Sequence, residues 1–246
     1  MNYSLKDVYN SLSPEKRKAD GTMTTILYRP VSYPASWLFL RAGLTPNAVT
    51  YASAAGCIAA LLLALLPFSA CHFAAIALFL VFAVLDCADG NMARTLGRKT
   101  VYGGWVDAAG GYLAYATELF SIGLSCFFFS GDFIILPFSG GAHVELPWGS
   151  ATWILLGGLA SVSNTLMRLF HQAFKNAENA AGIPSVPGAE KRFSEEIGIT
   201  GYLPVLYLAG LLTGLLPFVL VAYTVIYSGG FLMTTAKQLR KVSVVP

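Results

Sequence analysis

The chain has 246 residues, of which 55% are hydrophobic and 12% are charged, and its formal net charge is +3 at pH 7. Soluble domains carry about 25% charged residues, so this composition excludes an ordinary soluble globular protein. The mean hydropathy of +0.61 reflects apolar runs near the ~20-residue length that crosses a bilayer as a helix. The cysteines show no CxxC spacing, so they predict neither a disulfide framework nor a zinc site.

Residues 1–43 precede the first long apolar run and divide into two parts. Residues 1–21 are polar, lack the apolar core of a signal peptide and predict a short peripheral helix or a mobile segment. Residues 22–43 mix apolar, aromatic and basic side chains, which suits an amphipathic helix in the headgroup layer. An unstructured lead-in with a few aromatic anchors is the alternative. We therefore expect a cytoplasmic N-terminal arm over 1–43 and a membrane domain over 44–246.

The rest of the sequence predicts an all-α integral membrane fold with six transmembrane helices. The links at Pro67 and Pro217 are short and uncharged, as in tight turns between antiparallel helices. The approximate bounds of the six apolar stretches are 47–66, 71–95, 104–129, 150–173, 197–214 and 216–236.

The distribution of positive charge predicts the topology. All 16 Lys and Arg residues lie in the N-terminal arm, the 94–103 turn, the 168–192 region or the C-terminal tail. The link over 130–149 contains none. Because positive charge marks the cytoplasmic side, both termini should face the cytoplasm and the chain should be a multi-pass protein of the inner (cytoplasmic) membrane.

Three aspartates interrupt the apolar pattern of the second and third predicted helices. Asp86 and Asp89 are three residues apart, so they share one face of the second helix, and Asp107 lies near the start of the third. The topology places all three at the cytoplasmic rim. Carboxylates within membrane segments are costly and mark functional sites, and three unpaired ones would repel one another. A divalent cation resolves the repulsion, since hard oxygen ligands suit Mg²⁺ or Mn²⁺.

The residues after these aspartates make room for a phosphate. Gly90 and Ala93 remove side-chain bulk on the same face, so a flat ligand can approach the helix backbone. Arg94 supplies a forked donor that suits phosphate oxygens. Together these features indicate a diphosphate-binding cleft. The alternative is a structural polar network in which Arg94 neutralises one carboxylate.

The run over 84–118, VLDCADGNMARTLGRKTVYGGWVDAAGGYLAYATE, resembles the signature of the CDP-alcohol phosphotransferase family, D-x2-D-G-x2-A-R-x8-G-x3-D-x3-D. The segment RPVSYPASWLFLRAGLTPNAVT resembles the entry of that family into its first span. The resemblance covers roughly residues 25–240 and includes a six-helix core with an amphipathic N-terminal helix. Seven of the eight signature positions agree, namely Asp86, Asp89, Gly90, Ala93, Arg94, Gly103 and Asp107.

The resemblance implies a reaction. Such enzymes move a phosphoryl-linked alcohol from a CDP-alcohol, for example CDP-diacylglycerol, to an acceptor and release CMP, in phospholipid or related phospho-alcohol biosynthesis. By this resemblance the three aspartates ligate a pair of Mg²⁺ or Mn²⁺ ions at a site facing the cytoplasm, and the protein is a homodimer among membrane lipids. No nucleic-acid patch, Ser/His/Asp set or Walker loop is present in the sequence.

The resemblance also assigns candidates for nucleotide and acceptor binding. Gly90, Ala93 and Gly103 should leave room for the nucleotide, and Arg94 should steady the pocket or contact phosphate. Weaker nucleotide candidates, for which helix capping is the alternative role, are Thr45, Asn47 and Thr100. Basic residues hold the acceptor in this family, although topology and anionic headgroups also select them at such positions. The acceptor candidates are Arg168, Lys191 and Arg192.

The signature departs from the family at its fourth aspartate, which is Gly111 here. In the family that residue is thought to be the general base, and a base contributes about 10²–10⁴-fold to the rate. Glu118 is a candidate replacement, because it lies eleven residues after Asp107 and so on the same helix face. It would nevertheless stand about 16 Å away along the axis. Direct replacement therefore needs a bend, which Gly110 and Gly111 could permit.

Gly111 is also compatible with three further hypotheses. The acceptor could already be ionised, so that no base is needed. The glycine pair could make room for a bulkier acceptor, with Tyr112 or Tyr115 as donors. Finally, the protein could bind CDP-alcohols with impaired or no turnover. We favour an active or weakly active transferase over a catalytically impaired CDP-alcohol-binding protein. A cation transporter is the weakest hypothesis, because the sequence shows no inverted repeat.

Overall fold

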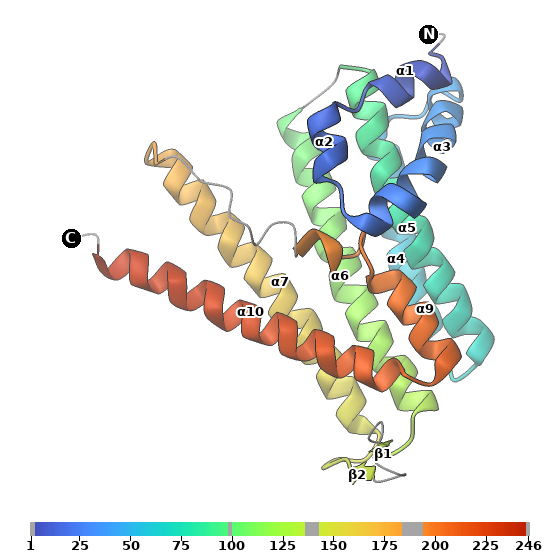
Figure 1. Cartoon of the computed structure of the whole chain (residues 1–246), viewed down its shortest axis with the longest axis vertical. Coiled ribbons are helices and arrows are strands. Elements are labelled where there is room, and N and C mark those ends of the chain that lie inside the picture. The colour runs from blue at the N-terminus through green and yellow to red at the C-terminus, as the bar shows by residue number, and fades with distance from the viewer. Residues whose placement is uncertain (1–2, 98–99, 136–142, 184–193, 245–246) are drawn as a thin grey trace.

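The structure, a computed structural model, is helical over most of the chain that it describes and contains one two-stranded hairpin there (Figure 1). The described residues are 3–97, 100–135, 143–183 and 194–244. The helices are α1 (Leu5–Asn10), α2 (Pro14–Ala19), η1 (Thr24–Tyr28), α3 (Arg29–Arg41), α4 (Pro46–Ala64), α5 (Ser69–Thr95), α6 (Val101–Phe129), α7 (Ala151–Ala180), α9 (Leu203–Thr213) and α10 (Leu216–Val244). The strands β1 (Phe133–Ile135) and β2 (His143–Glu145) pair antiparallel.

Five helices, α4, α5, α6, α7 and α10, are long and apolar enough to cross a membrane. They confirm a multi-pass membrane protein. The predicted span over 197–214 instead forms the 11-residue helix α9. At 1.5 Å per residue α9 measures about 16 Å, roughly half of a ~30 Å hydrocarbon core. The predicted count of six spans is therefore not confirmed.

The segment before α9 is turned rather than helical because of its glycines. A side chain on Gly201 would collide with the carbonyl oxygens of Glu195 and Glu196, and one on Gly198 would collide with the hydroxyl of Tyr115. The turn over 197–202 folds tightly here and packs against α6. Hydropathy alone cannot separate such a turn from the first turns of an apolar helix.

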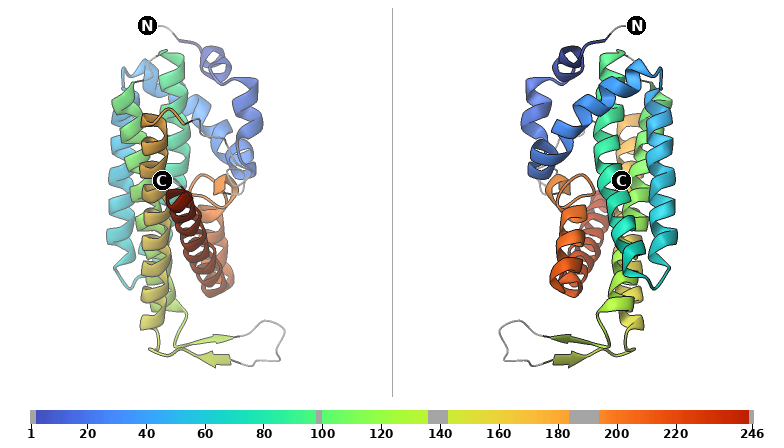
Figure 2. Two further views of the ribbon diagram at one scale, coloured as in Figure 1. Left: turned by 90° about the vertical axis from the view of Figure 1, so that its left-hand side faces the viewer. Right: turned by 90° about the vertical axis from the view of Figure 1, so that its right-hand side faces the viewer.

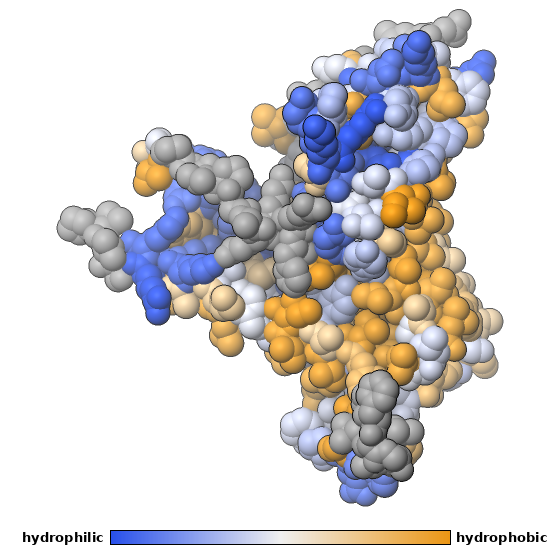
Figure 3. All heavy atoms as spheres, viewed as in Figure 1, coloured by the Kyte–Doolittle hydropathy of each residue, from blue (hydrophilic) through white to orange (hydrophobic). Residues whose placement is uncertain are grey.

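The long helices form two groups. Helices α4, α5 and α6 pack side by side, while α7 packs on both α6 and α10. Figure 1 shows the free ends of α7 and α10 leading away from the N-terminal arm, and Figure 2 shows the hairpin at the opposite end of the molecule from that arm. In Figure 3 a hydrophobic belt separates hydrophilic residues over the arm and over the ends of α7 and α10 from those at the hairpin.

The N-terminal arm is helical, so the alternative of an unstructured lead-in is wrong for the described residues. Helices α1 and α2 are both capped by serine, at Ser4 and Ser13. Helix α3 packs on α5 through small polar side chains: Ser32 and Ser36 are fully buried, and the Ser36 hydroxyl donates to the carbonyl of Ala88 at 3.1 Å. One face of α3 is thus part of the protein interior, and its place in the headgroup layer stays a prediction.

A buried polar chain joins α5, α6 and α9 inside the apolar core. His72 Nε2 is 2.8 Å from the carbonyl of Leu66, which only accepts, so Nε2 carries the proton. The other ring nitrogen therefore accepts from the hydroxyl of Ser125 at 2.7 Å. Ser125 Oγ is also 2.6 Å from the hydroxyl of Tyr207. This chain fixes the relative rotation of the three helices at the hairpin end.

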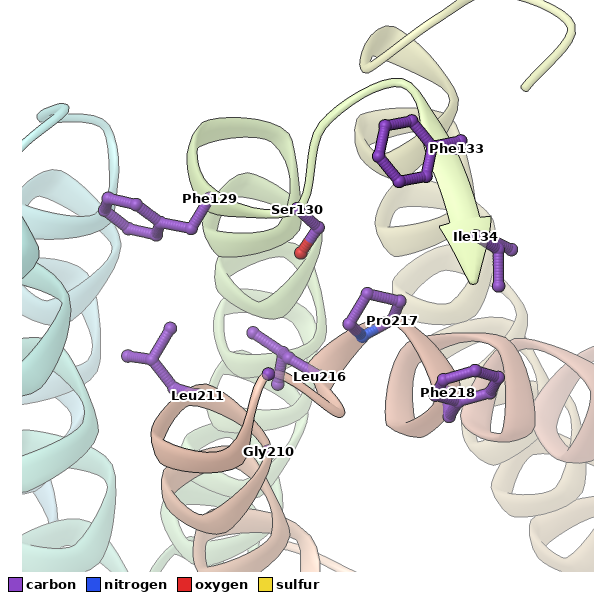
Figure 4. A pocket seen from close by; sticks show the side chains of 10 residues that line it. Phe129, Ser130, Phe133, Ile134, Gly210, Leu211, Leu216, Pro217 and Phe218 are labelled. Atoms are coloured by element: carbon purple, nitrogen blue, oxygen red, sulfur yellow. The ribbon is translucent and has the colours of Figure 1, made fainter. Parts of the chain in front are cut away.

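A small apolar cavity lies where α9 turns into α10, next to β1 (Figure 4). Phe129, Phe133, Leu216 and Phe218 contribute to its wall. It adjoins the C-terminal end of α6, whereas Asp107 lies near the N-terminal end of that helix. The cavity is therefore separate from the predicted site.

Helices α6 and α7 cross at a pair of glycines. A Cβ atom placed on Gly157 would lie 2.8 Å from Gly123 Cα and 3.1 Å from the carbonyl oxygen of Leu119. A Cβ atom on Gly123 would lie 2.7 Å from the carbonyl oxygen of Trp153. Small residues allow membrane helices to approach this closely. The contact sets the spacing between the two helix groups.

We predict that Gly157→Ala destabilises the protein by about 1–3 kcal/mol, because the new methyl group overlaps the α6 backbone. Thermal unfolding in detergent, followed by tryptophan fluorescence, measures the loss. Gly158→Ala is the matched control, since its Cβ would meet only a ring atom of Phe120 at 3.9 Å. Equal melting temperatures for the two variants would contradict the close crossing.

Candidate functional site

The predicted site lies at the turn that joins α5 to α6. Helix α5 carries the first two aspartates and Arg94, and the chain then reverses at Gly97, whose φ is +65°. Glycine adopts this left-handed conformation without strain. Helix α6 begins after Thr100, whose hydroxyl accepts from the backbone N–H of Gly103 at 2.9 Å. The left-handed residue Gly97 after α5 and the Thr100 cap of α6 bring the start of α6 back beside the end of α5.

The three aspartates lie close enough to influence one another electrostatically. Asp86 interacts with Asp107, and Asp89 interacts with both. Asp89 is 5% exposed and accepts a hydrogen bond from the hydroxyl of Thr50 on α4. Asp86 is half-buried and Asp107 is exposed. Within the described ranges no Lys or Arg forms an ion pair with any of them.

The chemistry of this donor set fits a hard divalent cation, because none of the three carboxylates forms an ion pair with a described Lys or Arg. Their arrangement does not yet form a coordination sphere. In the part of the chain that the structure describes, no three His, Cys, Asp or Glu side chains are placed to hold a metal ion. Metal binding by Asp86, Asp89 and Asp107 therefore stays a prediction.

Arg94 folds back over the helix that carries it. A Cβ atom on Gly90 would lie 3.3 Å from both terminal guanidinium nitrogens, so Gly90 makes room for Arg94 itself. Arg94 Nη2 donates to Asn91 Oδ1 at 2.8 Å. Arg94 forms no ion pair with a described carboxylate, so the structural alternative, in which it neutralises one of the aspartates, is not confirmed. Ala93 is half-buried on the adjoining turn.

Two of the nucleotide candidates cap helices. Thr45 accepts from the backbone N–H of Ala48 at 3.2 Å and caps α4, just as Thr100 caps α6. A Cβ atom on Gly103 would lie 2.9 Å from Thr100 Oγ1 and 3.7 Å from Asn47 Oδ1. Asn47, Thr100 and Gly103 are thus neighbours at the rim of the site. Nucleotide contact by any of them remains a prediction beside the observed capping.

The structure does not bring Glu118 to the aspartates. Helix α6 is continuous from Val101 to Phe129, so Gly110 and Gly111 do not interrupt it. Glu118 is 1% exposed, and its Oε1 has no hydrogen-bond partner among the described residues. It lies about 16 Å from Asp107 along the axis. A Cβ atom on Gly111, in contrast, would meet no described atom within 4 Å.

The acceptor candidate Arg168 is held against α6. Its Nε donates to Asn164 Oδ1 at 2.8 Å, and its guanidinium carbon lies 3.9 Å from the ring centroid of Tyr115. This cation–π contact is typical for arginine. Tyr115 lies two helical turns beyond Asp107, so Arg168 stands deeper along α6 than the aspartates. Lys191 and Arg192 lie outside the described residues.

One group of site residues was missed by sequence analysis. Arg29 of α3 is 8% exposed and forms a two-pronged ion pair with Asp20, at 2.7 Å from Nε and 3.2 Å from Nη2. Its Nη1 donates to Asn91 Oδ1 at 3.1 Å. Arg29 resembles an ordinary interfacial cation in the sequence, and Asn91 occupies an unspecified position of the signature. A contact across 62 residues leaves no periodic signal.

The sequence model of the family described as CDP-alcohol phosphatidyltransferase matches residues 43–170. The match includes α4, α5, α6 and the first two-thirds of α7, and thus more than half of the chain. The protein belongs to this family of membrane transferases for phosphate-containing groups, which bind a CDP-alcohol and an acceptor. No curated protein sequence matches the chain.

We predict that acid weakens the attachment of the arm. Burial alone would raise the pKa of Asp20, but the hydrogen bonds and charge of Arg29, with those of Lys16, lower the pKa below its ordinary value of 3.8. A carboxyl group with a lowered pKa contributes stability above its unfolded pKa and loses it as the pH falls through the folded pKa. The melting temperature should therefore fall as the pH drops below about 4.

Thermal unfolding between about pH 6 and pH 3 measures this effect. In Asp20→Asn the melting temperature should fall less between about pH 6 and pH 3. Glu145→Gln, at the exposed strand β2, should show the same fall as the unaltered protein. An identical fall in melting temperature with acid in Asp20→Asn and the unaltered protein would contradict the stabilising role of the Asp20 carboxylate.

Proposed function

We propose that the protein transfers a phospho-alcohol group of the phosphatidyl type from a CDP-alcohol to an acceptor and releases CMP, in a metal-dependent reaction of phospholipid or related phospho-alcohol biosynthesis. The observation that carries the proposal is the match to this family over residues 43–170, a range that contains Asp86, Asp89, Arg94 and Asp107. Arg94 follows Asp89 on α5 and forms no ion pair with a described carboxylate.

Each residue has a defined part in this reaction. The three aspartates would hold Mg²⁺ or Mn²⁺, which when bound neutralises charge on the diphosphate and on the departing CMP. Thr50 orients Asp89 by donating to its carboxylate. Arg94 would contact a phosphate of the nucleotide, which the rim residues Asn47, Thr100 and Gly103 would border.

The transfer forms one P–O bond and breaks another. The acceptor oxygen attacks the phosphorus that carries the alcohol, the bond from that phosphorus to the CMP oxygen breaks, and CMP leaves with the electron pair. A neutral hydroxyl acceptor must also lose its proton. Gly111 cannot take that proton, and Glu118 lies three turns away in the core. We therefore favour an acceptor whose attacking oxygen is already ionised, such as a phosphate, phosphonate or carboxylate.

The acceptor would approach from the side of α7. Arg168 provides a positive charge there, and Lys191 and Arg192, which lie outside the described residues, would add to it. The concentration of Lys and Arg at one end of the spans supports a site that faces the cytoplasm from the inner membrane. Membership of the family supports a homodimer.

A CDP-alcohol-binding protein with impaired catalysis is the second candidate. It is favoured by one specific observation, the open space beyond Gly111, where no described side chain replaces the carboxylate. Binding through the three aspartates and Arg94 does not require a base, so this candidate shares the same site.

We predict that purified protein with Mn²⁺ or Mg²⁺ releases CMP from at least one pair in a panel of CDP-alcohols and ionised or neutral acceptors. Asp89→Asn should lower the rate by at least about 10–100-fold, since even groups that merely support a metal ligand have effects of that size. Glu145→Gln, a carboxylate change at the hairpin, is the control. CDP-alcohol binding without CMP release from any pair would instead support the binding protein.

We further predict that Gly111→Asp restores a base where the acceptor is a neutral alcohol. The aspartate side chain would enter open space, so the variant protein should fold normally. CMP release with a hydroxyl acceptor should rise by up to about 10²–10⁴-fold, but release with an ionised acceptor should not rise. Gly111→Asn, of equal size but unable to accept the proton, is the matched control, and Glu118→Gln should leave the rate unchanged. Equal rates in the Asp and Asn variants with hydroxyl acceptors would refute this role of position 111.

A further inference from the structure

Asn91 is the centre of a buried hydrogen-bond network on α5, one turn before its end. The side chain is fully buried, and its oxygen accepts from two guanidinium groups, Arg29 Nη1 at 3.1 Å and Arg94 Nη2 at 2.8 Å. Its amide nitrogen donates to Ser32 Oγ at 3.0 Å, while Ser36 Oγ lies within 3.4 Å. A neutral amide thus joins α3 to the arginine of the proposed site.

Two arginines on one oxygen would repel each other unless one of them were neutralised. Asp20 performs this function for Arg29, because both of its carboxylate oxygens accept from that guanidinium group. The carbonyl of Cys87 accepts from Arg29 at 3.3 Å and fixes it further. Arg94 gains a strong acceptor in Asn91 and forms no ion pair with a described carboxylate, so its guanidinium group stays available to a ligand.

The position of Arg94 follows from this geometry. Gly90 lets the guanidinium group lie directly over the helix, and Asn91 holds one of its nitrogens there. A freely rotating arginine would lose more side-chain entropy on binding a phosphate than one already held in place.

We infer that Asn91 and Arg29 are positioning residues for Arg94, and that the N-terminal arm thereby forms part of the nucleotide-binding unit. The inference rests on the proposed function, in which Arg94 contacts the diphosphate. It assigns to the arm a role beyond membrane attachment. Asp20 and Arg29 set the position of Asn91, and Asn91 sets the position of Arg94.

The test measures binding of two soluble probes to the full-length protein in detergent, without added metal and again with Mg²⁺. CDP carries the diphosphate that Arg94 would contact, and cytidine carries only the nucleoside. Asn91→Ala should weaken CDP binding about tenfold, the loss expected for one charge-assisted hydrogen bond. Arg29→Lys should weaken it severalfold, because an ammonium group cannot bridge Asp20 and Asn91 as the planar fork does. Cytidine binding should be unchanged in both variants.

Tyr28→Phe is the matched control for a loosened arm. It removes the hydrogen bond from the Tyr28 hydroxyl to the carbonyl of Gly201 at 3.1 Å but leaves Asn91 untouched. CDP affinity should not change. Thermal unfolding of each variant verifies that it is folded. If Asn91→Ala does not fold, Arg29→Lys, which keeps the approximate size and the charge of the side chain, is the variant that tests the inference.

A double-mutant cycle separates positioning from general support of the fold. In the Arg94→Ala background, Asn91→Ala and Arg29→Lys should have no further effect on CDP binding. Two outcomes would overturn the inference but leave the proposed role of Arg94 intact. One is that the losses in CDP affinity are fully additive. The other is that both single variants fold and bind CDP normally while Arg94→Ala binds it weakly. Unchanged CDP affinity in Arg94→Ala would overturn the proposed role of Arg94 and the inference with it.

Discussion

The mutual repulsion of Asp86, Asp89 and Asp107 is the constraint around which the α5–α6 end of the molecule is built. Three carboxylates at one rim of a membrane protein are tolerated only where hydrogen bonds or cations compensate for the lost water. The chain supplies one such bond, from Thr50 of α4, and holds Arg94 nearby without pairing it to a described carboxylate. The proposed binding of an external cation and a phosphate would compensate for the remaining repulsion.

The surrounding helices are joined by contacts of two kinds. Toward the hairpin end, away from the aspartates, α6 and α7 meet backbone to backbone through Gly123 and Gly157. At the site end, α3 meets α5 through Ser32, Ser36 and Asn91, whose polar atoms satisfy one another. Glycine contacts bring the helices close but form no hydrogen bonds between side chains. The polar contacts can also orient a neighbouring side chain, which explains why they border the site.

Much of this arrangement could be predicted from local sequence. Five of the spans follow from hydropathy, because a bilayer-crossing helix needs a long apolar run, and the aspartates follow from a spacing that places them on adjoining helix ends. Thr45 and Thr100 cap helices as their neighbours Pro46 and Gly103 suggest. The short α9 could not be predicted, because Gly198 and Gly201 adopt a turn only in contact with Tyr115 and the arm. Arg29 could not be distinguished from a lipid-facing cation, since its partners Asp20 and Asn91 are defined by tertiary packing.

The segment over 194–202 holds the N-terminal arm against the second half of the chain. Thr22 donates to the carboxylate of Glu196, Thr24 donates to the carbonyl of Thr200, and Tyr28 donates to the carbonyl of Gly201, across 173 to 176 residues. At a synthesis rate of about 5–20 residues per second, roughly 10–35 s separate the appearance of the two partners on the ribosome. The contact between Arg29 and Asn91 spans only 62 residues and can form much earlier. The contacts of the arm with α5 can therefore form during synthesis before its contacts with the segment over 194–202, which must wait until α4, α5, α6 and α7 have been made.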